Sequence, residues 1–318
     1  MRLQALMLTP AGVMFTREYV AQPSPRQIPI RVLQAGICET DLQLVQGYMG
    51  FRGVPGHEFV GMAESGKFAG KRVVGEINCS CGTCETCERG LRTHCPHRSV
   101  LGILNHDGAF AERVWLPEEN LHEVPDSVSD DAAVFTEPLA AAFQIPAQLS
   151  LERFQSAVVL GDGRLGNLCA QVLAQSLSHV MVIGKHPWKL QQLQNLGLQT
   201  ARLADVTGSQ IADLVVDCTG SASGFRDACR LVRPRGTIVL KTTVAGDQGP
   251  SLAPVVIDEV TIVGSRCGPF APALAALAEQ SIHVESMITS RFPLEDGVQA
   301  FSTASDSQQF KVLLQIGA

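Results

Sequence analysis

The chain has 318 residues, a net charge of −6, 45% hydrophobic residues and 18% charged residues. The length predicts about two domains, and the composition is that of a folded globular protein rather than a disordered one. The acidic balance argues against a broad basic surface, so we expect no nucleic-acid partner.

The sequence carries no mark of a membrane or exported protein. No apolar run approaches the roughly 20 residues that a membrane span needs, and the N-terminal stretch lacks a signal-peptide pattern. We therefore expect a cytoplasmic location and no membrane partner. In a reducing compartment the ten cysteines indicate metal ligands rather than disulfides, and five of them fall between Cys79 and Cys95.

The first third of the chain predicts an irregular, mostly β domain. Its glycines, prolines and β-branched residues form short runs bounded by turn formers, such as 27–35 and 71–75. An Ala-rich stretch at 129–148 then predicts a helix.

From residue 157 onward, short apolar strands alternate with helical patterns. The expected strands are 157–160, 180–183, 214–217, 237–240 and 260–264, and the expected helices are 165–177 and 187–196. This alternation predicts a parallel sheet covered by helices on both faces. A helix at 271–280 and a strand at 310–316 follow.

The sequence GDGRLG fits the dinucleotide pattern G-x-G-x-x-G, directly after an apolar strand and at the start of a helix. Gly161 permits the tight turn, Gly163 lets the backbone approach a pyrophosphate, and Gly166 lets the helix pack closely on the strand. The N–H groups at the helix start, Arg164 and Leu165, are expected to face the phosphates. The alternative is an ordinary glycine-rich turn.

The end of the second expected strand bears on the type of cofactor. An NAD site usually places an acid there, about 20 residues after the glycines, to bond the ribose 2′-OH. The sequence has instead Gly184, Lys185 and His186. Lys185 and His186 could bind a 2′-phosphate, which favours NADP(H) over NAD(H). The alternative is that Lys185 is a solvated surface charge.

A C-x2-C-x2-C-x7-C pattern predicts a zinc site formed by Cys81, Cys84, Cys87 and Cys95. Four thiolates complete a tetrahedron and leave no position for substrate, so this zinc would be structural. Cys79 stands two residues before the set and is interpreted as a bystander, although it could compete as a ligand.

Three further motifs gain meaning only together: GICETDL at 36–42, GHEFVG at 56–61 and EPLA at 137–140. With the four cysteines, the glycine-rich turn and the segment 288–294, they resemble the medium-chain dehydrogenase/reductase superfamily, in its zinc-containing alcohol and polyol dehydrogenase branch. The resemblance covers nearly the whole chain.

The resemblance implies an α/β fold of two domains. A GroES-like, mostly-β catalytic domain at 1–146 would carry the structural-zinc lobe at 79–95. A Rossmann domain with a doubly wound parallel sheet would occupy 147–268, and 269–318 would return to the catalytic domain. A homodimer or homotetramer is also implied, with the strand at 260–264 as the candidate contact.

The resemblance further implies a catalytic zinc bound by Cys38 and His57. Glu58 and Glu137 would act as ligands directly, alternately or through water, and a glutamate rather than a second cysteine at 137 is typical of the polyol and secondary-alcohol branch. Such a zinc keeps one position open for the substrate oxygen and acts as a Lewis acid.

Two neighbours of Cys38 receive roles in the same way. Thr40 would relay the alcohol proton, unless it is a local cap. Asp41 would accept a hydrogen bond from the second nitrogen of His57 and so fix the ring, unless it only caps a turn or a helix.

These features together predict an oxidoreductase that transfers a hydride between a small secondary alcohol or polyol, or the matching ketone or aldehyde, and a nicotinamide cofactor. One alternative is an NADPH-dependent carbonyl reductase that works mainly in the reductive direction. The other is a non-catalytic zinc-binding module with a degenerate Rossmann domain.

Overall fold

The computed structural model describes residues 2–241 and 251–317 of the chain. By its contacts the chain divides into two compact units: Met1–Glu137 joined by Ala273–Ala318, and Pro138–Pro272. The expected return of 269–318 to the catalytic domain stays a prediction; in this division Ala273–Ala318 is grouped with Met1–Glu137. The first boundary lies inside helix α4, Thr136–Gln148, where no change of residue pattern marks it.

Antiparallel β structure dominates the first unit. A sheet has the order β16-β17-β3-β4-β5-β9, with β8 also paired to β3. The hairpin β1-β2 and the antiparallel pair β6-β7 form two separate two-stranded sheets. The strands are β1 Leu3–Thr9, β2 Gly12–Tyr19, β3 Gln27–Ile37, β4 Glu58–Ala63, β5 Arg72–Gly75, β6 Asn78–Cys79, β7 Ser99–Val100, β8 Arg113–Pro117, β9 Leu121–Glu123, β16 Ile288–Pro293 and β17 Lys311–Gln315. The mostly-β prediction is confirmed.

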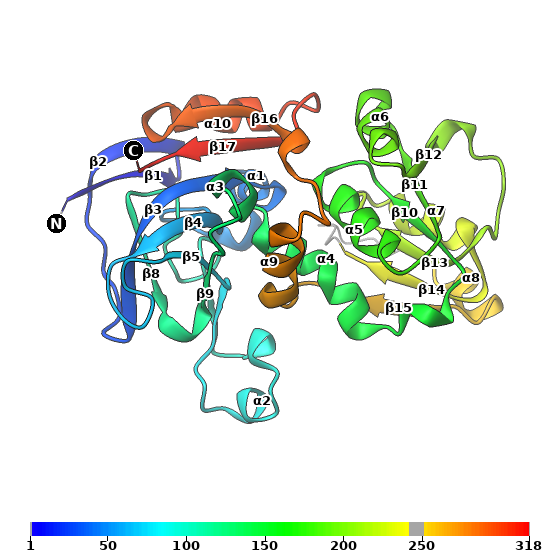
Figure 1. The fold of residues 1–318 in the computed structure, drawn as a ribbon, viewed down its shortest axis with the longest axis horizontal. Helices are drawn as coiled ribbons and strands as arrows, with labels where there is room; N and C mark the ends of the chain where they lie inside the picture. The colour runs from blue at the N-terminus through cyan, green and yellow to red at the C-terminus, as the bar shows by residue number, and fades with distance from the viewer. Residues whose placement is uncertain (1, 242–250, 318) are drawn as a thin grey trace. The chain divides into compact units, whose positions relative to one another are not determined.

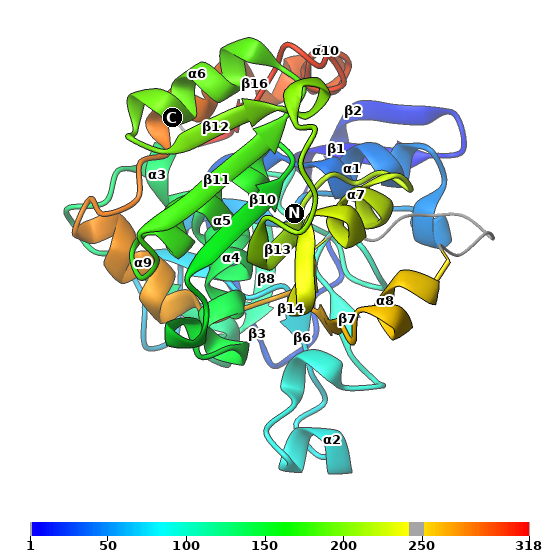
Figure 2. The same cartoon turned by 90° about the vertical axis from the view of Figure 1, so that its right-hand side faces the viewer.

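Short helices complete the first unit. They are α1 Glu39–Val45, α2 Glu85–Glu88, α3 Asp130–Ala133 and α10 Gly297–Ala304. The single helix expected at 129–148 is two helices, α3 and α4, because the Thr136 hydroxyl bonds the Ala133 carbonyl at 2.7 Å between them. The segment around α2 projects from the rest of its unit in two perpendicular views (Figures 1 and 2).

The second unit is built on a six-stranded parallel sheet with the order β12-β11-β10-β13-β14-β15 (Figure 2). Its strands are β10 Ser156–Leu160, β11 His179–Gly184, β12 Gln199–Arg202, β13 Ala212–Asp217, β14 Val232–Leu240 and β15 Thr261–Gly264. Its helices are α5 Arg164–Ala174, α6 Pro187–Asn195, α7 Gly224–Leu231 and α8 Ala253–Ile257, and α9 Phe270–Ala278 crosses the second boundary.

Strand order identifies this sheet as a doubly wound dinucleotide-binding sheet. Numbered within the unit, the order reads 3-2-1-4-5-6, which places the reversal of winding between β10 and β13. Ligands of such sheets bind at the carboxyl ends of the strands beside that reversal. The glycine-rich turn follows β10, so it stands at that place.

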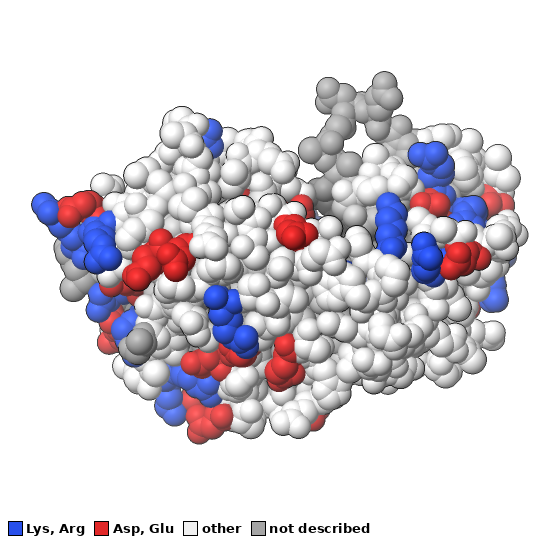
Figure 3. Space-filling model, turned by 90° about the horizontal axis from the view of Figure 1, so that it is seen from above, with Lys and Arg blue, Asp and Glu red and all other residues white. Residues whose placement is uncertain are grey.

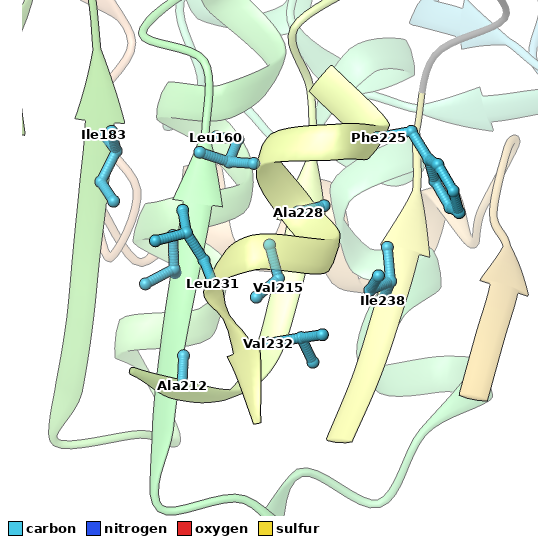
Figure 4. Close-up of a cluster of buried hydrophobic side chains, with 10 residues drawn as sticks. Leu160, Ile183, Ala212, Val215, Phe225, Ala228, Leu231, Val232 and Ile238 are labelled. Atoms are coloured by element: carbon cyan, nitrogen blue, oxygen red, sulfur yellow. The ribbon is translucent and has the colours of Figure 1, made fainter. Parts of the chain in front are cut away.

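One apolar cluster holds the strands of this sheet to α7. Val215 and Ile238 from β13 and β14 pack with Ala228 and Leu231 from α7, and all four are fully buried (Figure 4). Burial on this scale stabilises by roughly 25 cal/mol per Å² of apolar surface. The sheet is thus a rigid base for the turns at its edge.

Basic and acidic side chains are interspersed on the face that Figure 3 displays, without a continuous basic stripe. Among residues 2–241 and 251–317, no helix is long and apolar enough to cross a membrane.

Candidate functional site

Cys38 and Asp41 form an interlocked cap at the start of α1. The Thr40 N–H donates to the Cys38 Sγ at 3.2 Å, and the Cys38 N–H donates to the Asp41 Oδ2 at 2.9 Å. Reciprocal bonds of this kind satisfy N–H groups that a helix start otherwise leaves without partners. The cap fixes the buried sulfur in place, and Thr40 itself is half-buried.

His57 reaches this cap from the turn before β4. Its Nε2 lies 3.1 Å from the Cys38 Sγ. Gly56 has φ of +98°, and a Cβ there would collide with the ring of Phe110, so only glycine fits. The His57 Nδ1 lies 3.5 Å from the Asp41 Oδ1, beyond a normal N–H···O bond. Asp41 therefore faces the second ring nitrogen without bonding it, and accepts the Gly56 N–H at 3.2 Å instead.

Two glutamates also lie close to His57. Glu58 begins β4, and Glu137 belongs to the first turn of α4. The ligand atoms of these three residues all lie within 4.8 Å of one another, and so do those of Cys38, Asp41 and His57. His57 joins the two sets, so the structure gathers side chains that are distant in sequence around one imidazole.

Lys311 is a buried charged residue beside this cluster that the sequence analysis did not select. Its ammonium pairs with the Glu58 carboxylate, and both side chains are buried. Strand β3 lies between β17 and β4, and a Cβ on Gly36 would collide with the Lys311 side chain. The absence of a side chain at Gly36 therefore lets the Lys311 side chain cross β3 and reach Glu58 on β4. The sequence did offer a signal for this residue, because Lys311 is the one charged residue in the otherwise apolar run 310–314.

Burial and neighbouring charge act in opposite directions on Lys311. Burial lowers the pKa of its ammonium to about 8, while the negative charges of Cys38 and Asp41 raise it. A pKa of about 8 leaves the group mostly charged at neutral pH. The ring of Phe135 lies under the ammonium, 5.4 Å from its centroid. Lys311 thus supplies a buried positive charge behind the Cys38–His57–glutamate cluster.

The four cysteines of the projecting lobe lie as close together as ligands of one ion. The Sγ–Sγ distances are 3.5 Å for Cys84–Cys87, 3.6 Å for Cys81–Cys95, 3.8 Å for Cys84–Cys95 and 4.0 Å for Cys81–Cys87. A tetrahedron with metal–sulfur bonds of about 2.3 Å has edges of about 3.8 Å, so the set fits zinc. The fifth thiol, Cys79, is buried and accepts a weak bond from the Asn120 amide at 3.9 Å.

The glycine-rich turn has the backbone that a dinucleotide needs. Gly161 has φ of +110°, and a Cβ there or at Gly166 would collide with neighbouring backbone. Above Gly163 a Cβ would meet no atom within 4 Å, so the backbone is open to a close ligand. Arg164 and Leu165 form the first turn of α5, whose N–H groups provide a site for anions.

The turn between β11 and α6 holds the remaining predicted cofactor residues. Gly184 ends β11, the Lys185 side chain is exposed, and His186 is the N-cap of α6. A residue that the sequence analysis did not select, Asp162, reaches across from the glycine-rich turn and bonds this segment. Both segments follow neighbouring parallel strands, β10 and β11.

Family models and curated relatives match almost the whole chain. Residues 24–126 match the family model "Alcohol dehydrogenase GroES-like domain", and residues 130–316 match "Glucose dehydrogenase C-terminus". The chain is 28% identical to the sorbitol dehydrogenase of Halalkalibacterium halodurans, over 98% of this chain and 99% of that protein. It is 30% identical to the D-altritol 5-dehydrogenase of Agrobacterium fabrum, over 92% and 93%.

The fold has equally extensive counterparts among solved structures. A protein of Sinorhizobium meliloti 1021, solved with NADP bound, superposes with a TM-score of 0.89 and 24% identity, over 99% of each chain. At this identity the likeness shows the fold, so the chemistry has to be argued from the residues above.

Proposed function

We propose that Cys38, His57 and a glutamate hold the catalytic zinc of this chain, which belongs to the zinc-containing branch of the medium-chain dehydrogenase/reductase superfamily. The chain is a zinc-dependent, NAD(P)-linked alcohol or polyol dehydrogenase. The observation that carries this proposal is the gathering of thiol, imidazole and carboxylate ligand atoms around His57. This donor set is one that zinc prefers, and three ligands leave a fourth position for substrate.

Of the two glutamates, Glu137 is the proposed resting ligand. Glu58 is paired with the buried Lys311, which holds its carboxylate and neutralises its charge. Glu137 lies on α4, within 4.8 Å of the His57 ligand atom. Glu58 then serves as a second carboxylate that Lys311 keeps beside the site.

The protein contributes positioning and proton transfer. Zinc at these residues would act as a Lewis acid on a substrate hydroxyl, and a bound nicotinamide would accept the hydride. The cap between Cys38 and Asp41 fixes the thiolate, and burial of Cys38, His57 and Glu58 limits water around it. The Thr40 hydroxyl, in the first turn of α1, would relay the alcohol proton: it would accept that proton while passing its own to a ribose hydroxyl of the cofactor or to solvent.

We propose a polyol or small secondary alcohol as the substrate. A glutamate at 137, where a cysteine would mark the other alcohol dehydrogenases, favours this class. The two relatives named for sorbitol and D-altritol support it. For a non-catalytic zinc module, the second donor set around His57 and the intact glycine-rich turn would have no purpose.

Two neighbouring groups argue for different cofactors. The exposed Lys185 favours NADP(H), and with it the alternative of a carbonyl reductase driven by NADPH. The buried carboxylate of Asp162, beside the same turn, favours NAD(H).

We also propose a structural zinc at Cys81, Cys84, Cys87 and Cys95. We further propose a homodimer or homotetramer formed through the edge strand β15.

The test of the proposed function is a panel of small polyols and secondary alcohols with NAD⁺ and NADP⁺, read as absorbance of the reduced nicotinamide. We expect turnover with at least one polyol, and we expect Cys38→Ser to abolish it while the circular dichroism spectrum is kept. Turnover that survives Cys38→Ser would remove Cys38 from the catalytic site.

A further inference from the structure

Asp162 is the buried acid of the glycine-rich turn. Its side chain is 7% exposed and leaves its own turn to reach the segment after β11. Its Oδ2 accepts the N–H groups of Lys185 at 2.7 Å and His186 at 2.6 Å, and its Oδ1 lies 2.9 Å from the His186 Nδ1. These contacts hold the carboxylate in one position.

The Asp162 carboxylate occupies the space that a side chain on residue 184, at the end of β11, would fill. A Cβ built on Gly184 would lie directly against the Cβ and carboxylate of Asp162. Gly184 is the last residue of β11, and the end of this strand is where dinucleotide-binding sheets place the acid that bonds the adenosine ribose. The carboxylate that is missing from residue 184 therefore arrives at nearly the same point from residue 162.

We propose that Asp162 selects NAD(H) over NADP(H) by bonding the 2′-OH of the adenosine ribose and repelling a 2′-phosphate. This inference rests on the proposed nicotinamide-dependent function and names the residue that sets its cofactor. It differs from the expectation drawn from Lys185, because sequence spacing could not place a carboxylate of the glycine-rich turn beside residue 184.

The hydrogen bonds of Asp162 leave room for one more donor. A carboxylate offers about four acceptor positions, and the contacts with Lys185 and His186 use three of them. A ribose hydroxyl can donate to the remaining position, whereas a phosphate dianion has no proton to donate there. The same contacts occupy two backbone N–H groups that a 2′-phosphate would otherwise use.

Charge favours the same cofactor. Asp162 is buried, so its interaction with a phosphate is screened far less than that of the exposed Lys185 ammonium. An exposed lysine contributes little to ion pairing because water competes for it and its side chain loses freedom. The repulsion from Asp162 therefore outweighs the attraction from Lys185.

The experiment measures binding rather than turnover. Dissociation constants for NADH and NADPH are obtained by fluorescence titration of the zinc-loaded enzyme, together with those for ADP and adenosine 2′,5′-bisphosphate. We expect the wild type to prefer NADH by at least about tenfold. Asp162→Asn should lower this preference at least about tenfold, mainly by tightening NADPH binding, because the amide carries no charge.

Two variants and one further measurement make the test specific. Asp205→Asn removes an exposed acid elsewhere in the same unit and should leave the preference unchanged. Lys185→Gln should change it less than Asp162→Asn does. Melting temperature shows whether Asp162→Asn is folded, and Asp162→Ser provides a second neutral variant.

The possible results distinguish a failure of the Asp162 proposal from a failure of the proposed dehydrogenase function. A wild type that binds NADPH more tightly than NADH overturns the role of Asp162, whatever the variants do, and leaves the dehydrogenase proposal intact. If the preference for NADH over NADPH is lost in Lys185→Gln but kept in Asp162→Asn, the role of Asp162 is likewise overturned and the dehydrogenase proposal stands. If neither nucleotide binds, the proposed function itself fails.

Discussion

The Lys311 ammonium offsets negative charge that the motifs at 36–42 and 56–61 bury close together. Cys38 and Asp41 come from the start of α1, Glu58 comes from the start of β4, and each is less than a tenth exposed. An ionised carboxylate is costly to bury unless it is paired. The ammonium supplies this pairing for Glu58, which lies beside the proposed zinc ligands.

Replacing Lys311 by Met should therefore destabilise the first unit. Methionine keeps most of the side-chain volume but leaves Glu58 buried without its partner, a change that costs about 3–5 kcal/mol. The measurement is urea unfolding of the zinc-loaded protein in a Trp188→Phe background, so that Trp115 on β8 reports this unit alone. The double variant Lys311→Met/Glu58→Gln should recover much of the loss.

An exposed ion pair serves as the control. Arg92 pairs with Glu119, and their side chains are 47% and 54% exposed. Arg92→Met should cost less than about 1 kcal/mol. Equal losses for Lys311→Met and Arg92→Met would mean that the buried pair does not stabilise the unit.

The sequence locates residues of the site more readily than it locates the contacts between them. The motifs around Cys38 and His57 were found because their spacing matches a known pattern. The Lys311–Glu58 pair and the Asp162 contact with residue 184 depend on which strands lie side by side, and no local pattern encodes that. The bond expected between Asp41 and His57 is absent because Asp41 bonds the Gly56 N–H instead.

At the scale of elements, the lobe around α2 depends on sulfur rather than on apolar packing. Within the described segment 80–98, Cys87 and Cys95 are the buried residues. A segment with so little apolar burial cannot offset the entropy of ordering its chain by itself. A metal held by four thiolates would supply the missing stabilisation.

Cys84→Ser should therefore release about one zinc ion per chain and unfold the lobe locally. Zinc is counted by mass spectrometry of the acid-digested protein, and limited proteolysis should show new cleavage between residues 80 and 98. Cys79→Ser is the matched control, because Cys79 stands outside the tetrahedral set, and it should keep the full zinc content. Loss of zinc from Cys79→Ser but not from Cys84→Ser would reverse the assignment.

Elements were predictable where burial leaves a pattern in the sequence. The strands β10, β11, β13 and β14 are apolar runs and were found, whereas β12 reads Gln-Thr-Ala-Arg at the sheet edge and gives no such signal. Helix α7 was missed although Phe225, Ala228 and Leu231 repeat every three residues on its buried face. The β1-β2 hairpin was missed because every residue of β2 except the last is exposed or only partly buried.

At the scale of the whole molecule, the edge of the parallel sheet is the surface proposed above for binding a second copy of the chain. Strand β15 ends the sheet among the described residues, and Ile262 on it is 37% exposed. In the adjacent α8, Val256 and Ile257 are 76% and 78% exposed. An unpaired strand edge beside exposed apolar side chains is a surface that proteins usually cover.

We expect the wild type to be a dimer or tetramer, and Ile257→Asp to shift it toward monomer, because two-fold symmetry would bring both new charges into the same contact. Sedimentation velocity over a range of concentrations measures the shift. Val298→Asp is the control, since Val298 is 49% exposed on α10 of the other unit and should leave the association unchanged. A wild type that stays monomeric, or an Ile257→Asp variant that associates as the wild type does, would mean that this edge is not the contact.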